Sequence, residues 1–389
     1  MPRGGGEGAV RILSVVGRRS PLLWAALSSL ALFPGCGGGG GGDLPPQIEG
    51  YGLTVETARL SSTLHLFNFP EYLDEDLARE FQELYGVQIV QDFFDTNEAM
   101  IARLRAGGEG QFDLVVASDY AVEILREGGF LQPLDLSLLP NRANLHPGFV
   151  GLPYDPEGLY AVPYQWGTTG LGIRGDKVSI GPNTWADWRV IFDPARQLGR
   201  FALLDDPRET IGAALLYLGY SVNTTDDAEL TEAEAVLVSA RDRAVAFTPA
   251  STGRDLLVAG ELDVSHNHSG EIAWGTDEIP AIAYVVPRQG AVIWTDNLVI
   301  PAGSPAAYTA HVLINFLLDA QNGARLTETL RYASPNLASW SFLNETLRAE
   351  HERLAVSDML SGLEFIRDLG PERRKYDELW TRLKAGAAR

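Results

Sequence analysis

Apolar and polar residues repeat with two alternating periods along residues 64–129. Short apolar runs typical of buried strands cover residues 64–69, 87–94 and 112–118. Each run precedes a segment with helical periodicity that ends in glycine, at residues 74–86, 97–108 and 119–129. Repeated strand and helix units of this kind predict a parallel sheet with helices on both faces, where ligands bind beyond the carboxyl ends of the strands. The first candidates for a binding site are therefore the segments after the strands, 69–72, 95–98 and 118–120.

A second α/β section begins near residue 171. Its predicted strands are 200–206, 261–267, 281–287 and 292–301, and its predicted helices are 207–220, 227–243, 306–330 and 371–386. The sequence contains no P-loop, GxSxG or HExxH motif. The pattern predicts an α/β protein without a familiar catalytic signature.

The first 36 residues have the organisation of an export signal. A basic segment is followed by the apolar run PLLWAALSSLALF, too short for a comfortable membrane span, and then by PGC. This ending resembles a lipoprotein signal, in which the cysteine, here Cys36, is lipidated and becomes the new N-terminus. An ordinary export signal with an incidental cysteine is the alternative, and Arg18 and Arg19 also permit a twin-arginine signal. Residues 37–60, which begin with six glycines, predict a flexible tether.

Composition and charge narrow the class of ligand. The chain has 389 residues, of which 45% are hydrophobic and 21% charged, as expected for a folded protein with a sizeable core. Its formal net charge of −20 excludes a nucleic-acid partner, which needs a basic footprint, and favours cationic ligands. Cys36 is the only cysteine, so we expect an exported protein without disulfides.

Two aspartates end a predicted strand where a helix begins, in LLDDPRET at residues 203–210. Asp206 as N-cap, Pro207 in the first helical position and Glu209 in the third form a capping box, and each part stabilises by about 0.5–2 kcal/mol. The alternative places the same carboxylates at a strand end, facing a cation in a cleft. The sequence leaves both interpretations open.

Asp296 interrupts the apolar run AVIWTDNLVIP, two residues after Trp294. A buried carboxylate without a partner is costly, so another group has to satisfy it. The two side chains share one face of a strand and together offer an ammonium group both a carboxylate and a π face. A buried arginine is the structural alternative.

The stretch SHNHSGE, residues 265–271, has three interpretations. His266 and His268 share a face at a strand end, and Glu271 adds a carboxylate, so the spacing is compatible with a metal site. Purely structural histidines and the wall of a pocket for another ligand are the alternatives. A lone HxH motif does not decide among them.

Taken together and in order, these segments resemble the spermidine/putrescine-binding proteins that serve bacterial ABC-type polyamine importers. The resemblance is carried by LFNFPEYL (66–73), DTNEAMIARLRAG (95–107), FDLVVASDY (112–120), VPYQWGTTGLGI (162–173), LLDDPRET (203–210), LGYSVNTTD (218–226), WTDNLVIPAGSP (294–305), LINFLLDA (313–320), YASPNLAS (332–339) and LKAG (383–386). These segments extend over nearly the whole exported chain.

The resemblance implies a type II periplasmic binding protein fold, with two α/β lobes joined by a hinge and a ligand cleft between them. It places lobe 1 at residues 61–167 plus 294–340 and lobe 2 at residues 168–293 plus 341–389. It implies a periplasmic protein that captures a polyamine and delivers it to the permease subunits of an importer. We expect a monomer, anchored to a membrane through Cys36, with no cofactor and no catalytic activity.

The resemblance also implies roles for single residues. Acids that hold amine groups are matched by Asp206, Glu209 and Asp296, and an acid of the putrescine-type branch by Glu271. Cleft aromatics are matched by Tyr72, Tyr120, Trp294 and Tyr332. Neighbouring polar contacts are matched by Glu71 and Ser118, with Asp119 beside them.

Four positions depart from the family pattern. Phe69 and His268 stand where tryptophans are usual, Pro70 where a hydroxyl residue is usual, and Ile366 near where the spermidine branch has a glutamine. A protonated His268 would repel a cation, which predicts weaker binding as the pH falls through the range in which imidazole titrates.

Two other functions remain open: a receptor of this fold for a metal ion held by His266, His268 and Glu271, and a metal-dependent hydrolase using the same cluster.

Overall fold

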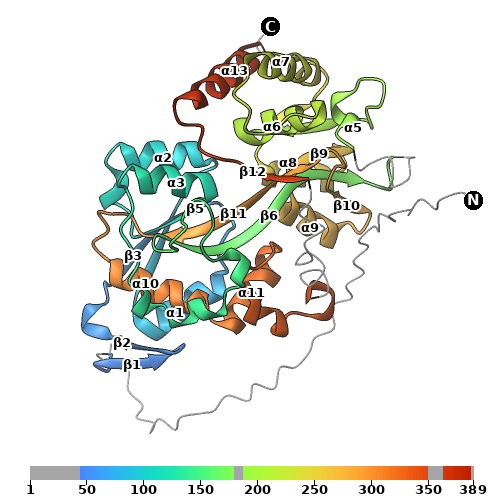
Figure 1. Cartoon of the computed structure of the whole chain (residues 1–389). Coiled ribbons are helices and arrows are strands. Elements are labelled where there is room, and N and C mark those ends of the chain that lie inside the picture. The colour runs from blue at the N-terminus through green and yellow to red at the C-terminus, as the bar shows by residue number, and fades with distance from the viewer. Residues whose placement is uncertain (1–43, 179–186, 349–361, 387–389) are drawn as a thin grey trace, which may run out of the picture.

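The computed structural model describes residues 44–178, 187–348 and 362–386. These residues form two α/β lobes, one above the other in Figure 1, that share a mixed sheet of ten strands. The main path of the sheet runs in the order β4-β3-β5-β11-β6-β9-β7-β8, while β10 pairs with β6 and β12 with β11. The predicted α/β fold with two lobes is confirmed.

The lower lobe in Figure 1 is built on three parallel strands, β3 (Thr63–Asn68), β4 (Gln88–Phe93) and β5 (Leu114–Ser118). One face of these strands is covered by α2 (Asn97–Arg105) and α3 (Asp119–Glu127), and the other by α1 (Glu75–Tyr85), α10 (Ala307–Leu317) and α11 (Ala320–Leu330). In α1, Leu77 and Phe81 are buried, as the helical spacing of its apolar residues predicts.

The upper lobe contains the strands β7 (Phe201–Leu204), β8 (Ala246–Thr248), β9 (Val264–His268), β10 (Ile282–Val285) and β12 (Leu363–Phe365). Its helices are α5 (Arg189–Phe192), α6 (Pro207–Leu218), α7 (Asp227–Arg241), α8 (Ala250–Ala259), α9 (Ser269–Glu278) and α13 (Arg373–Gly386). The strands β8, β7 and β9 are parallel, as in the lower lobe.

Two long strands run through both lobes. They are β6 (Ala161–Arg174) and β11 (Ala291–Val299), which pair antiparallel along most of their length. In the lower lobe β11 pairs with β5, and in the upper lobe β6 pairs with β9 and β10. The predicted lobe limits near residues 167 and 293 lie within or next to residues of these two strands, both of which run from one lobe to the other.

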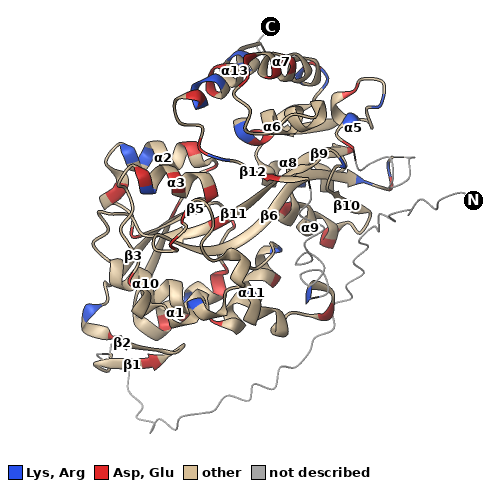
Figure 2. Cartoon of the chain, in the orientation of Figure 1, with Lys and Arg blue, Asp and Glu red and all other residues tan. Residues whose placement is uncertain are grey.

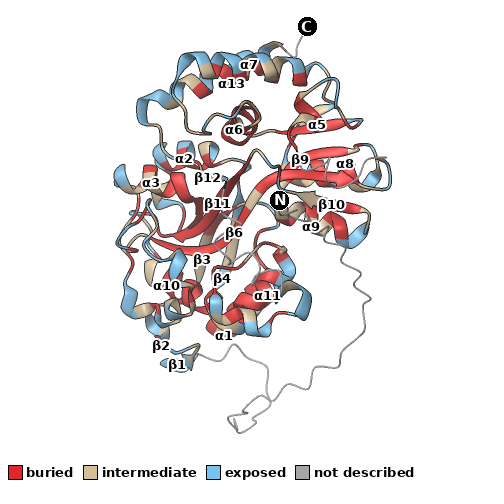
Figure 3. Ribbon diagram, turned by 45° about the vertical axis from the view of Figure 1, so that its right-hand side comes forward, coloured by how far each residue is buried: buried red, intermediate tan, exposed pale blue. Residues whose placement is uncertain are grey.

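The buried residues follow the sheet. Figure 3 shows central strands such as β6, β9 and β11 and the inner faces of the helices as buried, whereas the outer faces of helices such as α7 and α13 are exposed. Short 3-10 helices at Leu136–Leu138, Pro140–Asn144 and Pro147–Phe149 connect α3 to β6. No helix in the described part of the chain is both long and apolar enough to cross a membrane.

The predicted helix 306–330 is in fact two helices, α10 and α11. Asp319 is the N-cap of α11, and its side chain accepts hydrogen bonds from the backbone N–H groups of Gln321 and Asn322. An aspartate that satisfies the free N–H groups of a helix start favours a new helix over continuation of the old one. Apolar periodicity on both sides concealed this break.

The prediction of a flexible tether as far as residue 60 is wrong for the part that the structure describes. A hairpin of β1 (Gln47–Gly50) and β2 (Leu53–Glu56) is followed by a 3-10 helix, Thr57–Arg59. Val55 is fully buried, and the ring of Tyr51 packs on Phe316 of α10 at 4.7 Å between centroids. Apolar contacts therefore hold this segment on the lower lobe. Cys36 and the predicted signal lie outside the described residues.

Candidate functional site

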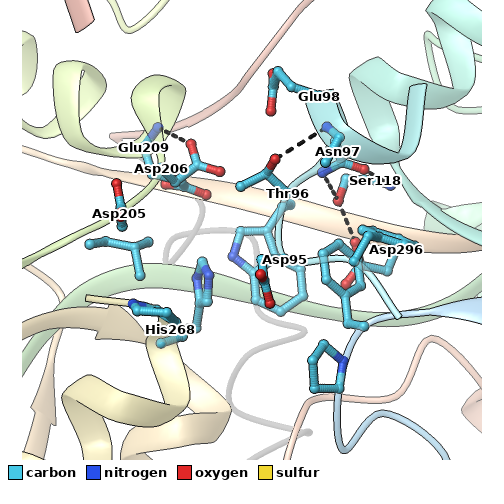
Figure 4. A pocket seen from close by; sticks show the side chains of 18 of the residues that line it. Asp95, Thr96, Asn97, Glu98, Ser118, Asp205, Asp206, Glu209, His268 and Asp296 are labelled. Atoms are coloured by element: carbon cyan, nitrogen blue, oxygen red, sulfur yellow. Dashed lines mark hydrogen bonds between the residues drawn. The ribbon is translucent and has the colours of Figure 1, made fainter. Parts of the chain in front are cut away.

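A cleft of about 960 Å³ lies at the strand ends between the two lobes (Figure 4). All of the predicted ligand-binding residues except Glu71 line it: Phe69, Tyr72, Ser118, Asp119, Tyr120, Asp206, Glu209, His268, Glu271, Trp294, Asp296 and Tyr332. The departing positions Pro70 and Ile366 line it as well. Residues far apart in the chain thus meet where the strand-end rule places a ligand.

The same local arrangement supplies an acid to the cleft four times. Each of α2, α3, α6 and α9 starts directly after a strand, and each carries a cleft-lining acid in its first turn. These acids are Glu98, Asp119, Glu209 and Glu271. The N-terminus of a helix stabilises a carboxylate through its free N–H groups and its dipole, so the fold tolerates negative charge at these positions.

Asp296 lines the cleft from β11 and is only 5% exposed. Its Oδ1 accepts a hydrogen bond from the Ser118 hydroxyl at 2.6 Å, and its Oδ2 accepts one from the Tyr72 hydroxyl at 2.8 Å. Among the described residues no arginine or lysine pairs with it, so the structural alternative of a buried arginine is wrong. Burial raises the pKa of Asp296 to about 6, although the two hydroxyl groups act in the opposite direction.

Asp206 combines both interpretations of LLDDPRET. Its Oδ1 accepts hydrogen bonds from the backbone N–H groups of Arg208 and Glu209, so it caps α6 as predicted. Among the hydrogen bonds of the described residues, none returns from the Glu209 side chain to Asp206, and the second half of the capping box is missing. Burial, followed by the charge of Glu98 in the opposite lobe, raises the pKa of Asp206 to about 7.

Three buried carboxylate oxygens near Asp206 accept no hydrogen bond within the described part of the chain. They are Oε2 of Glu98, Oδ2 of Asp119 and Oε2 of Glu209. Burial raises the pKa of Glu209 and of Asp119 well above the usual range of a carboxyl group. We call Glu98, Asp119, Asp206 and Glu209 the unpaired end of the cleft. Such a cluster is costly unless it is protonated or meets a cation.

Aromatic rings form the walls between these acids. Tyr332 stands edge-on to both Tyr72 and Trp294, with 5.3 Å between ring centroids in each case. The Trp294 indole N–H donates to Thr169 at 3.1 Å, and the Tyr120 hydroxyl donates to Glu98 at 3.0 Å. These bonds orient the rings, so the cleft offers fixed apolar and π surfaces beside its carboxylates.

Glu271 lines the cleft but already has a cation beside it. Its Oε2 accepts a hydrogen bond from a guanidinium nitrogen of Arg254 on α8, at 2.7 Å. The same nitrogen lies 3.3 Å from Oε2 of Glu71, the one predicted ligand-binding residue outside the cleft lining. Burial raises the pKa of Glu271 to about 7, and Arg254 acts against this rise.

The two histidines of SHNHSGE have different surroundings. His266 is buried edge-on against Trp188, 5.3 Å between centroids, and does not line the cleft, whereas His268 lines it and its Nδ1 lies 3.0 Å from the Thr169 hydroxyl. The described residues contain no group of three His, Cys, Asp or Glu side chains placed to hold a metal ion. The arrangement does not favour the metal-receptor or hydrolase alternatives.

Burial also changes the expected titration of these histidines. It lowers the pKa of His266 to about 3 and that of His268 to about 4. His268 is therefore neutral between pH 5.5 and 7.5. The predicted repulsion of a cation by a protonated His268 in that range is contradicted, because a buried imidazole resists taking up charge.

The complete lining is strongly acidic. It includes the carboxylates of Asp92, Asp95, Glu98, Asp119, Asp205, Asp206, Glu209, Glu271, Asp296 and Asp377, against the single arginine Arg103. Acidic residues occur on both lobes in Figure 2, whereas basic residues stand out on helices such as α2 and α13. A cleft of this charge attracts cations and repels anions.

Some lining residues were missed by sequence reasoning. Glu98 lies in the strand-end segment 95–98, so the position was indicated but the residue was not selected. Asp377 and Trp380 come from α13, and Pro249 to Ser251 from the start of α8. No local signal marks these residues, because only the packing of distant helices brings them to the cleft.

Comparisons with known proteins agree with this architecture. The family model of the bacterial extracellular solute-binding proteins matches residues 76–341. The putrescine/cadaverine-binding protein of Pseudomonas aeruginosa is 35% identical over 340 residues, covering 84% of this chain and 95% of the relative. The spermidine/putrescine-binding periplasmic protein of Escherichia coli is 32% identical over 335 residues, covering 86% and 95%.

A solved structure extends the agreement to three dimensions. The putative spermidine/putrescine ABC transporter protein of Listeria monocytogenes superposes with a TM-score of 0.77 at 33% identity, covering 83% of this chain and 99% of that one. Family model, relatives and fold point the same way. The chain therefore belongs to the bacterial extracellular solute-binding proteins and, among them, to the family of the spermidine/putrescine-binding periplasmic proteins.

Proposed function

We propose that this protein captures a polyamine in the cleft between its lobes. The observation that carries the proposal is a set of buried carboxylates, contributed by both lobes, that lack a cationic partner while aromatic rings stand between them. Protonated amines separated by methylene groups complement both features, because ammonium groups need charge-assisted hydrogen bonds and the methylene chain needs apolar walls. The relatives whose names include putrescine, cadaverine or spermidine support the same class of ligand.

The proposal assigns roles to the lining residues. Asp296, oriented by Tyr72 and Ser118, holds one amine, and the unpaired end holds another through Asp206 and Glu209. The rings of Phe69, Tyr120, Trp294 and Tyr332 enclose the methylene chain. Two charged stations joined by an apolar path match a diamine or one half of a longer polyamine.

We infer from the family that the protein works outside the cytoplasm, as a monomer that delivers its ligand to the permease of an ABC transporter and catalyses no reaction. The two lobes joined by β6 and β11 fit a receptor that closes around its ligand. Lipidation of Cys36 is part of this proposal and would attach the lower lobe, through residues 37–46, to a membrane surface.

Isothermal titration calorimetry with putrescine, cadaverine and spermidine tests the proposal. We expect binding to the unaltered protein and a loss of about 2 kcal/mol or more, roughly 30-fold in Kd, for Asp296→Asn, because an ammonium group loses its buried counter-charge. Asp76→Asn makes the same chemical change on the exposed surface of α1 and should bind like the unaltered protein. If none of the three amines gives heat or thermal stabilisation with the unaltered protein, the proposed function is wrong.

A further inference from the structure

Arg254 does not line the cleft itself, but its guanidinium contacts Glu271, one of the acids in the cleft wall. It lies on α8, only 7% exposed, and stacks over the ring of Trp274 at 5.0 Å. Its guanidinium reaches Glu271 at 2.7 Å and Asp255 at 3.0 Å in the upper lobe, and Glu71 at 3.3 Å in the lower lobe. One fixed cation thus joins acids of both lobes.

The pair of Arg254 and Glu271 is buried, whereas Glu71 is not. The side chain of Glu271 is 15% exposed and that of Glu71 is 51% exposed. An exposed ion pair contributes little, so the contact with Glu71 adds little to the stability of this arrangement. The buried contact with Glu271 is the one that changes the charge of the cleft.

Glu271 would otherwise be a third station for an amine. It lines the cleft together with Tyr332 and Asp296, and Tyr332 lies in the electrostatic field of both acids. A guanidinium that donates to a carboxylate oxygen occupies an acceptor position that an ammonium group would use, and it offsets the negative charge that would attract the ammonium group. A ligand amine at Glu271 would also meet the guanidinium itself.

We propose that Arg254 is a specificity-determining residue, a built-in cation that takes the place of a ligand amine at Glu271 and limits the cleft to two amine stations. The inference rests on the proposed function. It implies that a third amine adds no affinity at this end, so the protein selects diamines or binds triamines through two of their amines.

The test compares Kd values of spermidine and putrescine in Arg254→Gln, Glu271→Gln and the double variant. Arg254→Gln should improve spermidine relative to putrescine by about tenfold, because it frees a carboxylate worth about one charge-assisted hydrogen bond. Glu271→Gln alone should change putrescine affinity less than threefold, and the double variant should return the ratio to that of the unaltered protein. Arg325→Gln, which removes an arginine paired with Glu80 away from the cleft, is the matched control.

The outcomes separate this inference from the proposed function. If the unaltered protein binds no polyamine, the proposed function fails. If it binds diamines but the ratio is the same in Arg254→Gln, or putrescine affinity falls threefold or more in Glu271→Gln, the inference about Arg254 is overturned while the function stands. Should thermal unfolding show that Arg254→Gln is not folded, the Glu271→Gln result decides by the same limits.

Discussion

The two ends of the cleft use the same local structure and differ in one neighbour. At both ends a strand leads into a helix whose first turn carries an acid, Glu209 on α6 and Glu271 on α9. Glu271 contacts Arg254 from α8, whereas the buried Oε2 of Glu209 accepts no hydrogen bond from the residues that the structure describes. Acids in the same local position can therefore differ in whether another helix supplies an ion-pair partner, which α8 does for Glu271 through Arg254.

A carboxylate without a cationic partner has opposite effects on ligand binding and on the stability of the empty protein. A buried carboxylate without a partner destabilises the empty protein, since its charged form has lost its water and gained nothing in return. The same carboxylate contributes most when a cationic ligand arrives. The unpaired end is therefore maintained at a cost to the unliganded fold, and the paired end is not.

A change of pH should have the largest effect on the affinity of the cleft for its ligand. Burial raises the pKa of Asp206 to about 7 and that of Asp296 to about 6, and only the ionised forms attract an amine. The contribution of these two groups to affinity is thus lost as the pH falls below about 7.5, by roughly a hundredfold at pH 5.5 if both groups have to ionise. Calorimetry at pH 5.5, 6.5 and 7.5 measures this, and an affinity that rises toward pH 5.5 would contradict it.

The stability of the protein without ligand should change with pH in the opposite direction to its affinity for the ligand. Both folded-state pKa values lie above the value of about 4 in the unfolded chain, so the neutral forms favour folding. The stability that they contribute is present below pH 4 and is lost as the pH rises through 6 and 7. The melting temperature without ligand should therefore fall between pH 5.5 and 7.5, and a saturating diamine should reduce this fall.

The substitution Glu209→Gln should change ligand affinity by a smaller amount. We expect putrescine to bind about tenfold more weakly, since one charge-assisted hydrogen bond is lost, while the empty protein melts about 1–3 °C higher because a buried unpaired carboxylate has been removed. Calorimetry and thermal unfolding measure the two quantities in the same variant. A fall in both affinity and melting temperature would mean that Glu209 is stabilised within the empty protein.

His268→Gln should have the smallest effect. Burial lowers the pKa of His268 to about 4, so its imidazole does not change charge between pH 5.5 and 7.5. The dependence of putrescine affinity on pH in this variant should match that of the unaltered protein within about twofold. A clearly flatter profile would show that His268, and not the carboxylates, titrates in this range.

Much of the site was predictable because its residues follow strands. The strand and helix pattern placed Tyr72, Ser118 and Tyr120 at strand ends, and the position of Asp296 within an apolar run indicated a buried charge that needs a partner. The resemblance to a known family then ordered the acids of the two lobes around one cleft. Local sequence was misleading for residues 47–59 and 306–330, where glycine content and continuous periodicity concealed a hairpin and a helix break.

The sequence by itself determined the alternating α/β elements, the acidic character of the chain and the acids that begin its helices, because these depend on periodicity and composition over a few turns. Only the tertiary structure decided which of those acids stay unpaired. Asp296 is satisfied by hydroxyl groups of Tyr72 and Ser118, and Glu271 by Arg254, through contacts between residues 17 to 224 positions apart. The charge state of a buried carboxylate depends on the few ångströms around it, and those surroundings exist only once the lobes have folded together.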